Sequence, residues 1–319
     1  MDIYQYTYDL VKQIPAGKIS TYGAVARALG DVRASRAVGR MMNQNPDPDC
    51  MPCFKIVQSD GMIGGFGRGI EDKIKRLKDD GIDVKDNKII NFDQVFFNDF
   101  QTDYPLKTCR KEQQDLSKKV DLTDSIAEKN IDLVAGFDVA YSYDDDWKES
   151  CGACVILDVK TNKIVEHQVV FKKTRFPYIP TYLSFREKPF IEEVFEQLNH
   201  RPNVVFVDGN GILHPRQFGL ACHIGVILDM PTLGVAKNLL CGRQQPDNSI
   251  MYKNQKLGHA FYANKRVKKP VYISPGHKIS LNTSIRLVKK LSSYKQPEPL
   301  RQAHLHATKS FRKYHQNHY

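Results

Sequence analysis

Residues 203–238, NVVFVDGNGILHPRQFGLACHIGVILDMPTLGVAKN, contain two short apolar runs separated by one longer apolar segment. The first run, 203–207, has the length and the β-branched content of a buried strand, and it ends at Asp208 in a Gly-containing turn. Residues 216–229 are predicted to form a helix, and residues 231–238 a second strand. A strand, a helix and a strand in this order are typical of a sheet that is covered by helices.

The segments on the N-terminal side of this stretch extend the same pattern. Apolar runs within 132–142 and 153–173 predict three more strands, and a turn joins the second and third of them. Residues 109–120 and 188–200 have the spacing of helices. The predicted order is therefore three strands, a helix, a strand, a helix and a strand, followed by further helix, which favours an α/β domain with a mixed sheet.

The first part of the chain is mainly helical. Residues 2–14, 21–30 and 32–46 have helical spacing, and the last two segments are joined by a brief turn, as in a helix-turn-helix. Residues 69–82 predict one more helix. We therefore expect a multidomain protein of α+β and α/β type: a first domain over 1–88, a linker over 89–104 and a second domain over 105–319.

Composition limits the classes of protein that need to be considered. Of the 319 residues, 41% are hydrophobic, so a buried core is expected, and no apolar run is long enough to span a bilayer. The first residues lack the pattern of a signal peptide, so we expect a cytoplasmic protein without a membrane partner. The seven cysteines do not suggest a disulfide framework in a chain of this length.

Positive charge is concentrated at the C-terminal end. The net charge is +11, and residues 241–319 contain 16 Lys and Arg against two Asp and Glu. A segment this basic indicates a polyanionic partner, with nucleic acid as the first candidate. A solvated cationic face remains the alternative.

Three acidic residues occupy positions that are unusual for surface side chains. Asp138 interrupts an apolar strand, Asp208 ends another, and Glu187 precedes a predicted helix. Buried carboxylates are normally paired or bound to metal, and Mg²⁺ prefers oxygen ligands. The three side chains could form a site for metal-assisted phosphodiester cleavage. Alternatively, they are turn residues at strand ends that share no site.

Several longer motifs occur in a fixed order, namely FDVAYS, FPYIPTYLSFRE, the stretch 205–242, YISPGHKIS and PEPLRQAHL. Over residues 105–308 the chain resembles endonuclease V, a family that nicks nucleic acid near deaminated adenine. The resemblance implies an RNase H-like fold and Mg²⁺, for which Mn²⁺ can substitute, held by Asp138 and Asp208 and completed by Glu187. It implies no small-molecule cofactor, and we expect a monomer.

The same resemblance implies roles for further residues. Lys237 stabilises charge at the phosphate, and Tyr178 is the wedge that enters the duplex where a base is turned out. His214 and His304 fall at positions that line the site. Asn210 departs from the family, which often has a histidine there, and we expect altered tuning because an amide still forms hydrogen bonds.

The first domain has a resemblance of its own, in TYGAVARALGDVRASRAVGRMMNQNPDPDCMPCFKIVQSDGMIGGFGRG. Over residues 3–83 it is similar to the winged-helix-like DNA-binding domain of O6-alkylguanine-DNA alkyltransferases. Cys53 falls at the position of the alkyl-accepting cysteine. Arg36 matches the arginine that fills the gap left by the flipped base, Tyr22 the tyrosine that pushes the phosphate, and Asn45 the asparagine ahead of the cysteine.

Two departures concern the chemistry of Cys53. Phe54 replaces the histidine that activates the cysteine, and Phe66 replaces a tyrosine of the lesion pocket; Asp80 falls where the family has a glutamate that orients the histidine. Residues 1–166 contain no histidine, so we expect slow transfer from an unassisted thiol. Core filling remains the alternative for Cys53.

A zinc site is the weaker reading of the cysteines. Cys50 and Cys53 form one Cys-x-x-Cys pair, and Cys151 and Cys154 form another, but the pairs lie too far apart for a zinc ribbon.

These resemblances predict a bifunctional DNA repair protein. The second domain nicks DNA on the 3′ side of deoxyinosine, with other deaminated bases as further candidate substrates, and leaves a 5′-phosphate. Cys53 accepts alkyl groups from O6-alkylguanine. Two alternatives stay open: the first domain is a non-enzymatic lesion sensor that recruits the nuclease, or the nuclease acts on inosine in RNA.

Overall fold

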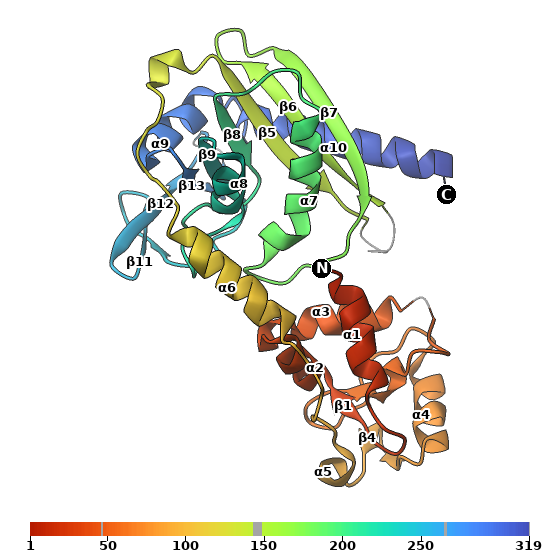
Figure 1. Ribbon diagram of the computed structural model, residues 1–319. Helices are drawn as coiled ribbons and strands as arrows, with labels where there is room; N and C mark the ends of the chain where they lie inside the picture. Colours follow the sequence, from red (N-terminus) through yellow and green to blue (C-terminus); the bar gives the residue numbers. More distant parts are fainter. Residues whose placement is uncertain (46, 143–148, 265–266, 319) are drawn as a thin grey trace. The chain divides into compact units, whose positions relative to one another are not determined.

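The computed structural model of the chain describes residues 1–45, 47–142, 149–264 and 267–318 (Figure 1). It contains two compact units: Met1–Lys111 with Arg175–Pro180, and Glu112–Thr174 with Thr181–Tyr319. None of the helices in the described ranges combines the length and the apolar character that crossing a bilayer requires.

The first unit is built from short helices and two pairs of very short strands, β1 with β2 and β3 with β4. Its elements, in chain order, are α1 (Ile3–Lys12), β1 (Ser20–Thr21), α2 (Tyr22–Leu29), η1 (Val32–Ala34), α3 (Ser35–Asn43), η2 (Cys53–Lys55), β2 (Ile56–Val57), α4 (Ile70–Asp79), β3 (Val84–Lys85), β4 (Lys88–Ile89) and α5 (Phe92–Val95). The next helix, α6 (Pro105–Ser117), contains the boundary between the two units.

Helices α2 and α3 form the predicted helix-turn-helix. Thr21 caps α2 by accepting a hydrogen bond from the backbone of Ala24 at 3.0 Å, and the helix ends at Gly30, whose φ of +104° is accessible to glycine. Helix α3 buries Val38 and Met41 on one face and leaves Arg36 exposed on another. The second helix therefore presents a basic surface to solvent, as a recognition helix does.

The stretch 89–104, which we expected to be a linker, is structured in part. Its helix α5 packs against the hydrophobic cluster of the first unit through Phe92 and Val95. The backbone of Ile19 donates to Val95 O at 2.9 Å and accepts from Phe97 N at 2.7 Å. Burial of these aromatic and branched side chains stabilises the fold more than their exposure in a linker would, so the first unit continues to Lys111.

The second unit contains one nine-stranded sheet with the strand order β10-β11-β12-β13-β9-β8-β5-β6-β7. Its strands are β5 (Leu133–Ala140), β6 (Glu149–Asp158), β7 (Ile164–Lys173), β8 (Val204–Val207), β9 (Thr232–Ala236), β10 (Arg243–Gln244), β11 (Ser249–Tyr252), β12 (Gln255–Phe261) and β13 (Val271–His277). Strands β5, β8 and β9 are parallel to one another, and the other neighbours are antiparallel.

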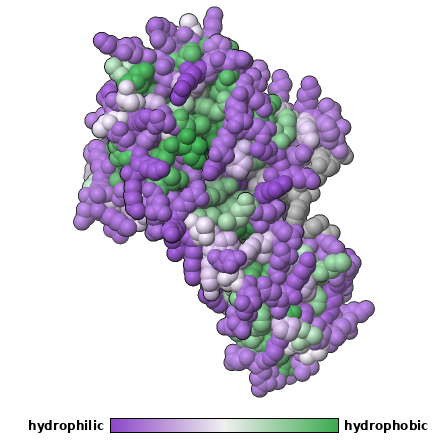
Figure 2. Space-filling model, viewed as in Figure 1, coloured by the Kyte–Doolittle hydropathy of each residue, from purple (hydrophilic) through white to green (hydrophobic). Residues whose placement is uncertain are grey.

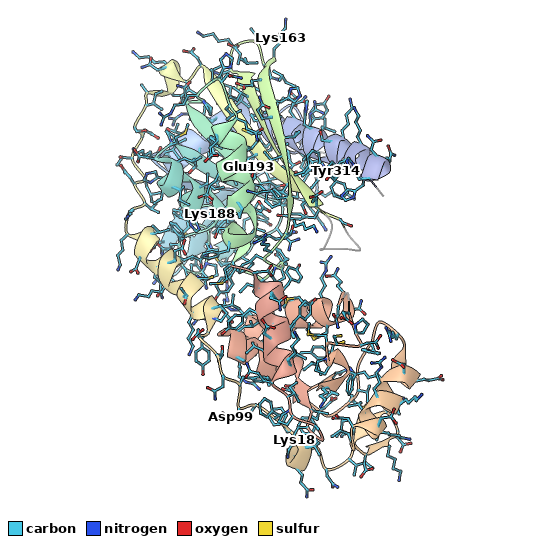
Figure 3. The ribbon with its side chains drawn as sticks, turned by 45° about the vertical axis from the view of Figure 1, so that its right-hand side comes forward. Lys18, Asp99, Lys163, Lys188, Glu193 and Tyr314 are labelled. Atoms are coloured by element: carbon cyan, nitrogen blue, oxygen red, sulfur yellow. The ribbon has the colours of Figure 1, made fainter. Side chains whose placement is uncertain are left out.

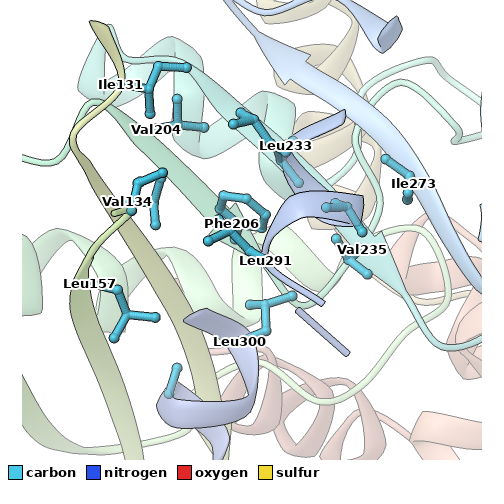
Figure 4. Packing of buried hydrophobic residues seen from close by; sticks show 14 of the residues in the cluster. Ile131, Val134, Leu157, Val204, Phe206, Leu233, Val235, Ile273, Leu291 and Leu300 are labelled. Carbon is cyan, nitrogen blue, oxygen red and sulfur yellow. The ribbon is translucent and has the colours of Figure 1, made fainter. Parts of the chain in front are cut away.

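Helices cover both faces of this sheet. Its helical elements are α7 (Leu183–Glu196), α8 (Leu220–Leu228), α9 (Leu281–Lys290) and α10 (Glu298–His318), with a short turn η3 (Glu128–Asn130) before β5. Leu287 and Leu300 of α9 and α10 share a core with Val134 and Phe206 on one face (Figure 4). Phe190 of α7 and the residues of α8 share a second core on the other face.

Glycine in the central strands permits this close packing. A Cβ atom on Gly136 of β5 would lie 2.0 Å from the carbonyl oxygen of Pro299, at the start of α10. A Cβ atom on Gly152 of β6 would lie 2.8 Å from Phe190 of α7. Each helix can therefore approach the sheet only because these positions lack a side chain.

The predicted order of strands and helices from β5 to β9 is present, but the sequence did not predict β10 to β13. Strands β10 to β12 are short and polar, with burial that alternates weakly, and β13 contains Pro275 and Gly276, so they lack the apolar runs that identified the others. The face of the molecule seen in Figure 2 is mainly hydrophilic, with a hydrophobic area around α7 and α8.

Candidate active sites

The carboxyl ends of the three parallel strands bring separate sequence motifs together. Phe137 of β5 pairs with Val207 of β8, so Asp138 and Asp208 are the next residues on neighbouring strands. Strand β9 follows, and Lys237 comes directly after it. Residues alternate between the faces of a sheet, and Val134, Phe206 and Val235 all belong to the core under α9 and α10. Asp138, Asp208 and Lys237 therefore lie on that same face.

Each aspartate is paired with a basic side chain. His304 of α10 places Nδ1 2.7 Å from Asp138 Oδ2, and Lys237 Nζ donates to Asp208 Oδ2 at 2.5 Å. The side chains of both aspartates are mostly buried, with 12% and 14% exposed, whereas those of His304 and Lys237 are about half exposed. The two pairs of side chains therefore lie between the buried core of the sheet and the solvent.

Glu187, in the first turns of α7, is the third acid of this group. It is buried and accepts a hydrogen bond from the hydroxyl of Tyr141 at 3.2 Å. Burial raises the pKa of Glu187 well above its usual value, and the charges of Asp138 and Asp208 raise it further. The guanidinium of Arg186, 4.1 Å from the ring centroid of Tyr141, opposes this shift.

The ionisation of these groups is linked. Burial and the charge of Asp138 raise the pKa of Asp208, while Lys237 lowers it. Burial alone would lower the pKa of Lys237, but the charges of Asp208 and the two other acids raise it overall. The hydrogen bond to Asp138 raises the pKa of His304 against the opposing effect of burial. The site is therefore a compact group of acids with cations at its solvent side.

The three carboxylates have the chemistry of a divalent-metal site, although they are not arranged as a complete set of ligands. Carboxylate oxygens are the ligands that Mg²⁺ and Mn²⁺ prefer, and mutual repulsion between three acids is what a bound cation relieves. Across the described residues, no three His, Cys, Asp or Glu side chains converge in an arrangement ready to hold an ion. Nearby, the buried Oδ1 of Asn210 has no hydrogen-bond partner among the described residues.

His214 and Tyr178 have surroundings of different kinds. His214 is buried, its Nε2 lies 3.2 Å from the carbonyl oxygen of Thr181, and its Nδ1 accepts from the backbone of Arg216 at 3.2 Å. Tyr178 is 56% exposed and belongs to the segment Arg175–Pro180. An exposed aromatic ring of this kind is available to contact a ligand.

Thr181, three residues after Tyr178, holds an unusual backbone conformation. Its φ is +74°, which is rare for a β-branched residue. Its carbonyl oxygen accepts hydrogen bonds from Arg216 Nη2 at 2.6 Å and Gln113 Nε2 at 3.0 Å, and Arg216 also donates to Gln113 Oε1 at 2.8 Å. We refer to Gln113, His214 and Arg216 as the Thr181 clamp. Sequence analysis missed two of its members, since neither Gln113 nor Arg216 stands out by spacing.

In the first unit, Cys53 lies at the start of η2 and is only 2% exposed. Asn45 Nδ2 donates to its sulfur at 3.3 Å. Burial raises the pKa of Cys53, which the hydrogen bond from Asn45 and the charge of Lys73 partly offset. Burial, followed by the proximity of Cys53, raises the pKa of Tyr22 as well, so Tyr22, Asn45 and Cys53 lie in one place.

Lys73 is a third residue that sequence analysis missed. It is 1% exposed, and its ammonium donates to Ile56 O at 2.6 Å, Ile63 O at 2.8 Å and Gly65 O at 3.4 Å. Burial lowers the pKa of Lys73 to about 8, and Cys53 opposes that shift. The signal was its position one helical turn before the buried Leu77, on the apolar face of α4.

The side chains expected to activate Cys53 have other partners. Asp80 forms an ion pair with Lys55 at 2.8 Å and accepts from Gly17 N at 3.1 Å. Phe54 packs against the hydrophobic cluster that contains Ile19. Phe66 is half-buried. The relay of imidazole and carboxylate found in the resembling family therefore has no counterpart here.

Neither Cys-x-x-Cys pair supports a zinc site. Cys50 is exposed and Cys53 is buried, and all the cysteines of the described ranges are free. Cys151 and Cys154 are buried in β6, three positions apart, so their side chains point to opposite faces.

A cavity of about 590 Å³ lies elsewhere in the second unit. It is lined by residues at the ends of α7 and α8, among them Phe195, His200 and Ile227. The lining residues precede β8 and β9 in the chain and lie at the amino ends of these strands. Asp208 and Lys237, by contrast, follow the strands at their carboxyl ends. It is therefore separate from the acidic site.

An acidic group at the carboxyl edge of a mixed, helix-covered sheet defines a nuclease of the RNase H-like class. Residues 114–305 match the family model of endonuclease V, and residues 2–82 match that of the 6-O-methylguanine DNA methyltransferase DNA-binding domain. The chain belongs to the endonuclease V family, in the group whose members also carry this second domain. Endonuclease V is a metal-dependent family.

Relatives match along nearly the whole chain. A bifunctional methyltransferase/endonuclease of Picrophilus torridus is 39% identical over 95% of this chain and 95% of its own. One from Thermoplasma volcanium is 37% identical over 95% of this chain and 88% of its own.

Solved structures resemble the second unit. The catalytic domain of human endonuclease V is 30% identical with a TM-score of 0.62, covering 67% of this chain and 98% of that one. Endonuclease V of Ciona intestinalis, in complex with DNA containing an inosine followed by a ribo-adenosine, is 28% identical with a TM-score of 0.60, covering 66% and 99%.

Proposed function

We propose that the second unit nicks DNA on the 3′ side of deoxyinosine and leaves a 5′-phosphate. The observation that carries this proposal is the position of Asp138 and Asp208 directly after neighbouring parallel strands, paired with His304 and Lys237, with Glu187 buried within reach of their charges. The choice of substrate is supported by the similar endonuclease V of Ciona intestinalis, which was solved with inosine-containing DNA.

The residues of the chain divide the work of cleavage. Asp138, Asp208 and Glu187 would hold Mg²⁺ or Mn²⁺, which when bound supplies charge neutralisation at the phosphate and an acidified water. Lys237, about half exposed, is positioned to bind a phosphate oxygen, because its ammonium has donors beyond the one used by Asp208. His304 holds Asp138 in place and keeps a proton on its side of the site.

The wedge role fits the exposure of Tyr178. Turning a base out of a duplex opens a step in the stack, and an exposed aromatic ring can fill it. The Thr181 clamp, which includes His214, would fix the chain that follows Tyr178.

Cleavage by the variant Asp208→Asn tests the nuclease. We expect at least a hundredfold loss of nicking on a deoxyinosine duplex in Mg²⁺ or Mn²⁺, with binding retained, because a neutral amide is a poor ligand for a hard cation. Asp229→Asn, at an exposed aspartate paired with Lys278, is the matched control. Full activity of Asp208→Asn would remove the acidic site from the reaction.

We also propose that Cys53 accepts an alkyl group from O6-alkylguanine. Its thiolate attacks the alkyl carbon, the bond from that carbon to O6 breaks, and guanine leaves with the electron pair and takes up a proton. Asn45 stabilises the thiolate through its hydrogen bond, and Tyr22 and Arg36 would contact the phosphate and the emptied stack. Support comes from the two relatives whose names include methyltransferase.

Intact-protein mass measurement tests the transfer. After incubation with an O6-methylguanine oligonucleotide, the wild type should gain one methyl group, as should Cys50→Ala, whereas Cys53→Ala should gain none. An adduct that survives in Cys53→Ala would move the reaction to another residue.

A lesion sensor is the second candidate for the first unit, and the burial of Cys53 beside Phe54 favours it. Binding of the O6-methylguanine oligonucleotide without any mass gain, at every pH that preserves the fold, would select it. RNA is the second candidate substrate for the nuclease, and rates on matched inosine and deoxyinosine strands separate the two. A single copy of the chain contains every residue in these proposals, so a monomer suffices.

A further inference from the structure

Helix α10 continues beyond the part of the chain that matches the family model of endonuclease V. The match ends at residue 305, whereas α10 extends from Glu298 to His318. The catalytic group meets this helix at His304, just before the match ends. Residues 306–318, which we call the distal turns of α10, therefore begin beside the acidic site.

These distal turns, which include Tyr314 (Figure 3), are anchored to the sheet. The ring of Tyr314 stacks on Phe171 of β7 with 4.3 Å between centroids, and its hydroxyl donates to the carboxylate of Glu149. His315 Nε2 lies 2.9 Å from the backbone oxygen of Glu149, and Ala307 is buried. The helix is thus held in one orientation over β6 and β7.

The path of the helix follows from the strand register. Ala140 of β5 pairs with Cys151 of β6, which pairs with Phe171 of β7, so these residues form one row across the sheet. Asp138 lies two residues before Ala140 on β5. Between His304 at Asp138 and Tyr314 at Phe171, α10 therefore crosses the sheet outward from the acidic site, near the same edge.

The outward face of the distal turns is basic. Lys309, Arg312 and Lys313 are exposed, and their spacing of three and four residues places them on one side of the helix. In the described part of the chain, none of the three has an acidic partner. A cationic surface that is rigidly held and unpaired attracts a polyanion strongly, because counterions are released on binding.

We propose that Lys309, Arg312 and Lys313 bind the phosphates of the substrate strand as it leaves the acidic site. This proposal rests on the nuclease function proposed above. At a rise of about 1.5 Å per residue, Arg312 lies about 12 Å along the helix from His304. That distance corresponds to three or four base pairs of duplex, at about 3.4 Å each. The three residues extend the nucleic-acid surface on one side of the scissile phosphate.

The test compares two charge-matched pairs on helices of the same face. Arg312→Gln with Lys313→Gln removes two positive charges from α10, and Lys289→Gln with Lys290→Gln removes two exposed charges from the last turn of α9, which packs against β12 and β13. Binding of a deoxyinosine duplex is measured without divalent metal over a range of salt. The α10 pair should weaken binding several-fold at low salt and reduce the salt slope by about 1–2, and the α9 pair should change neither.

A second measurement fixes the position of the contact. Duplexes are shortened in steps on either side of the lesion, and wild-type affinity should fall when one side becomes shorter than about four base pairs. The α10 pair should be insensitive to that shortening. The single-turnover nicking rate at saturating DNA should stay unchanged, because these residues do not touch the carboxylates.

Equal effects of the two pairs, or an unchanged salt slope in the α10 pair, would overturn the proposal and leave the basic face as solvated surface. Failure of the wild type to nick deoxyinosine would instead contradict the proposed function. Because binding is measured without metal, the two failures are distinguishable.

Discussion

At the scale of single residues, Cys53 has an environment that works against its own reactivity. The thiolate is the nucleophile, and burial raises the pKa of Cys53 above that of an ordinary thiol. Asn45 and Lys73 oppose this effect, one by a hydrogen bond to sulfur and the other by charge. Since the pKa of Lys73 is lowered to about 8, its charge is present at neutral pH and is lost above pH 8.

The reaction of Cys53 with iodoacetamide should therefore rise with pH, as the thiolate fraction increases towards the raised pKa. Lys73→Met should slow it below pH 8, by up to about tenfold for each unit by which the pKa of Cys53 moves up. Above pH 8 the difference should shrink, because wild-type Lys73 is then largely neutral. Peptide mass mapping measures Cys53 separately from Cys50.

Two variants control this experiment. Lys73→Arg keeps the charge and should keep most of the rate, whereas Lys75→Met removes an exposed charge from the same helix and should have no effect. A profile of Lys73→Met that matches wild type from pH 6 to pH 10 would contradict the role of Lys73.

At the scale of elements, the sheet positions the acidic site and the Thr181 clamp positions the chain next to Tyr178. A positive φ at a β-branched residue stores about 1–3 kcal/mol and persists only where its surroundings impose it. Arg216 supplies two hydrogen bonds to Thr181, one to the carbonyl and one to the hydroxyl. The clamp therefore fixes Thr181 within the second unit.

Arg216→Ala should reduce the preference for deoxyinosine over undamaged DNA about tenfold, which corresponds to about 1.4 kcal/mol of lost positioning. Tyr178→Ala should show the same loss of preference, since both changes affect one segment. The ratio of the two binding constants is the measurement. Arg286→Ala, at an exposed ion pair with Glu128, is the control. A purely structural clamp would lower stability in Arg216→Ala and leave the preference intact.

The contact of α10 with β5 allows a second test at this scale. Gly136→Ala should lower the free energy of unfolding of the second unit by about 1–3 kcal/mol or more, because its new methyl group meets backbone atoms of Pro299 that cannot rotate away. Gly209→Ala is the milder comparison, since its methyl group would meet the Leu220 side chain at 3.1 Å. Urea unfolding measures both, and equal stability of the two variants would contradict the packing argument.

How much of this fold could be predicted from the sequence differs from residue to residue. Asp138 and Asp208 were identifiable because a carboxylate that interrupts or ends an apolar strand is unusual. Lys73 and Arg216 were not identified from the sequence because their hydrogen-bond partners come from distant segments. These partners are the carbonyls of Ile56 and Ile63 for Lys73, and Thr181 for Arg216. Strands β10 to β12 were missed because short polar strands are specified by their neighbours rather than by their own pattern.

At the scale of the whole molecule, one chain carries two candidate sites that share no residue. Cys53, Asn45 and Lys73 belong to the first unit, and Asp138 and Asp208 belong to the second. Nothing in either group depends on a side chain of the other. The two activities should therefore be separable by mutation.

Cys53→Ala should nick deoxyinosine DNA at the wild-type rate, within about twofold, and Asp208→Asn should accept a methyl group at the wild-type rate. Independent sites have additive effects, so the double variant should lack both activities and show no further loss of stability beyond the sum of the two. Nicking is measured by gel and transfer by mass. Loss of nicking in Cys53→Ala on DNA without an alkyl lesion would show that the units are coupled.

The position of His304 also has a consequence for the order in which the protein becomes active during synthesis. The first unit, apart from 175–180, is complete in sequence by Lys111, and domains generally fold as they leave the ribosome. Asp138 cannot acquire its partner His304 from α10 until translation has passed residue 304, about 190 codons later at roughly 5–20 residues per second. A nascent chain would thus hold its DNA-binding unit ready for roughly ten seconds or more before it can cut, while messenger and ribosomal RNA surround it.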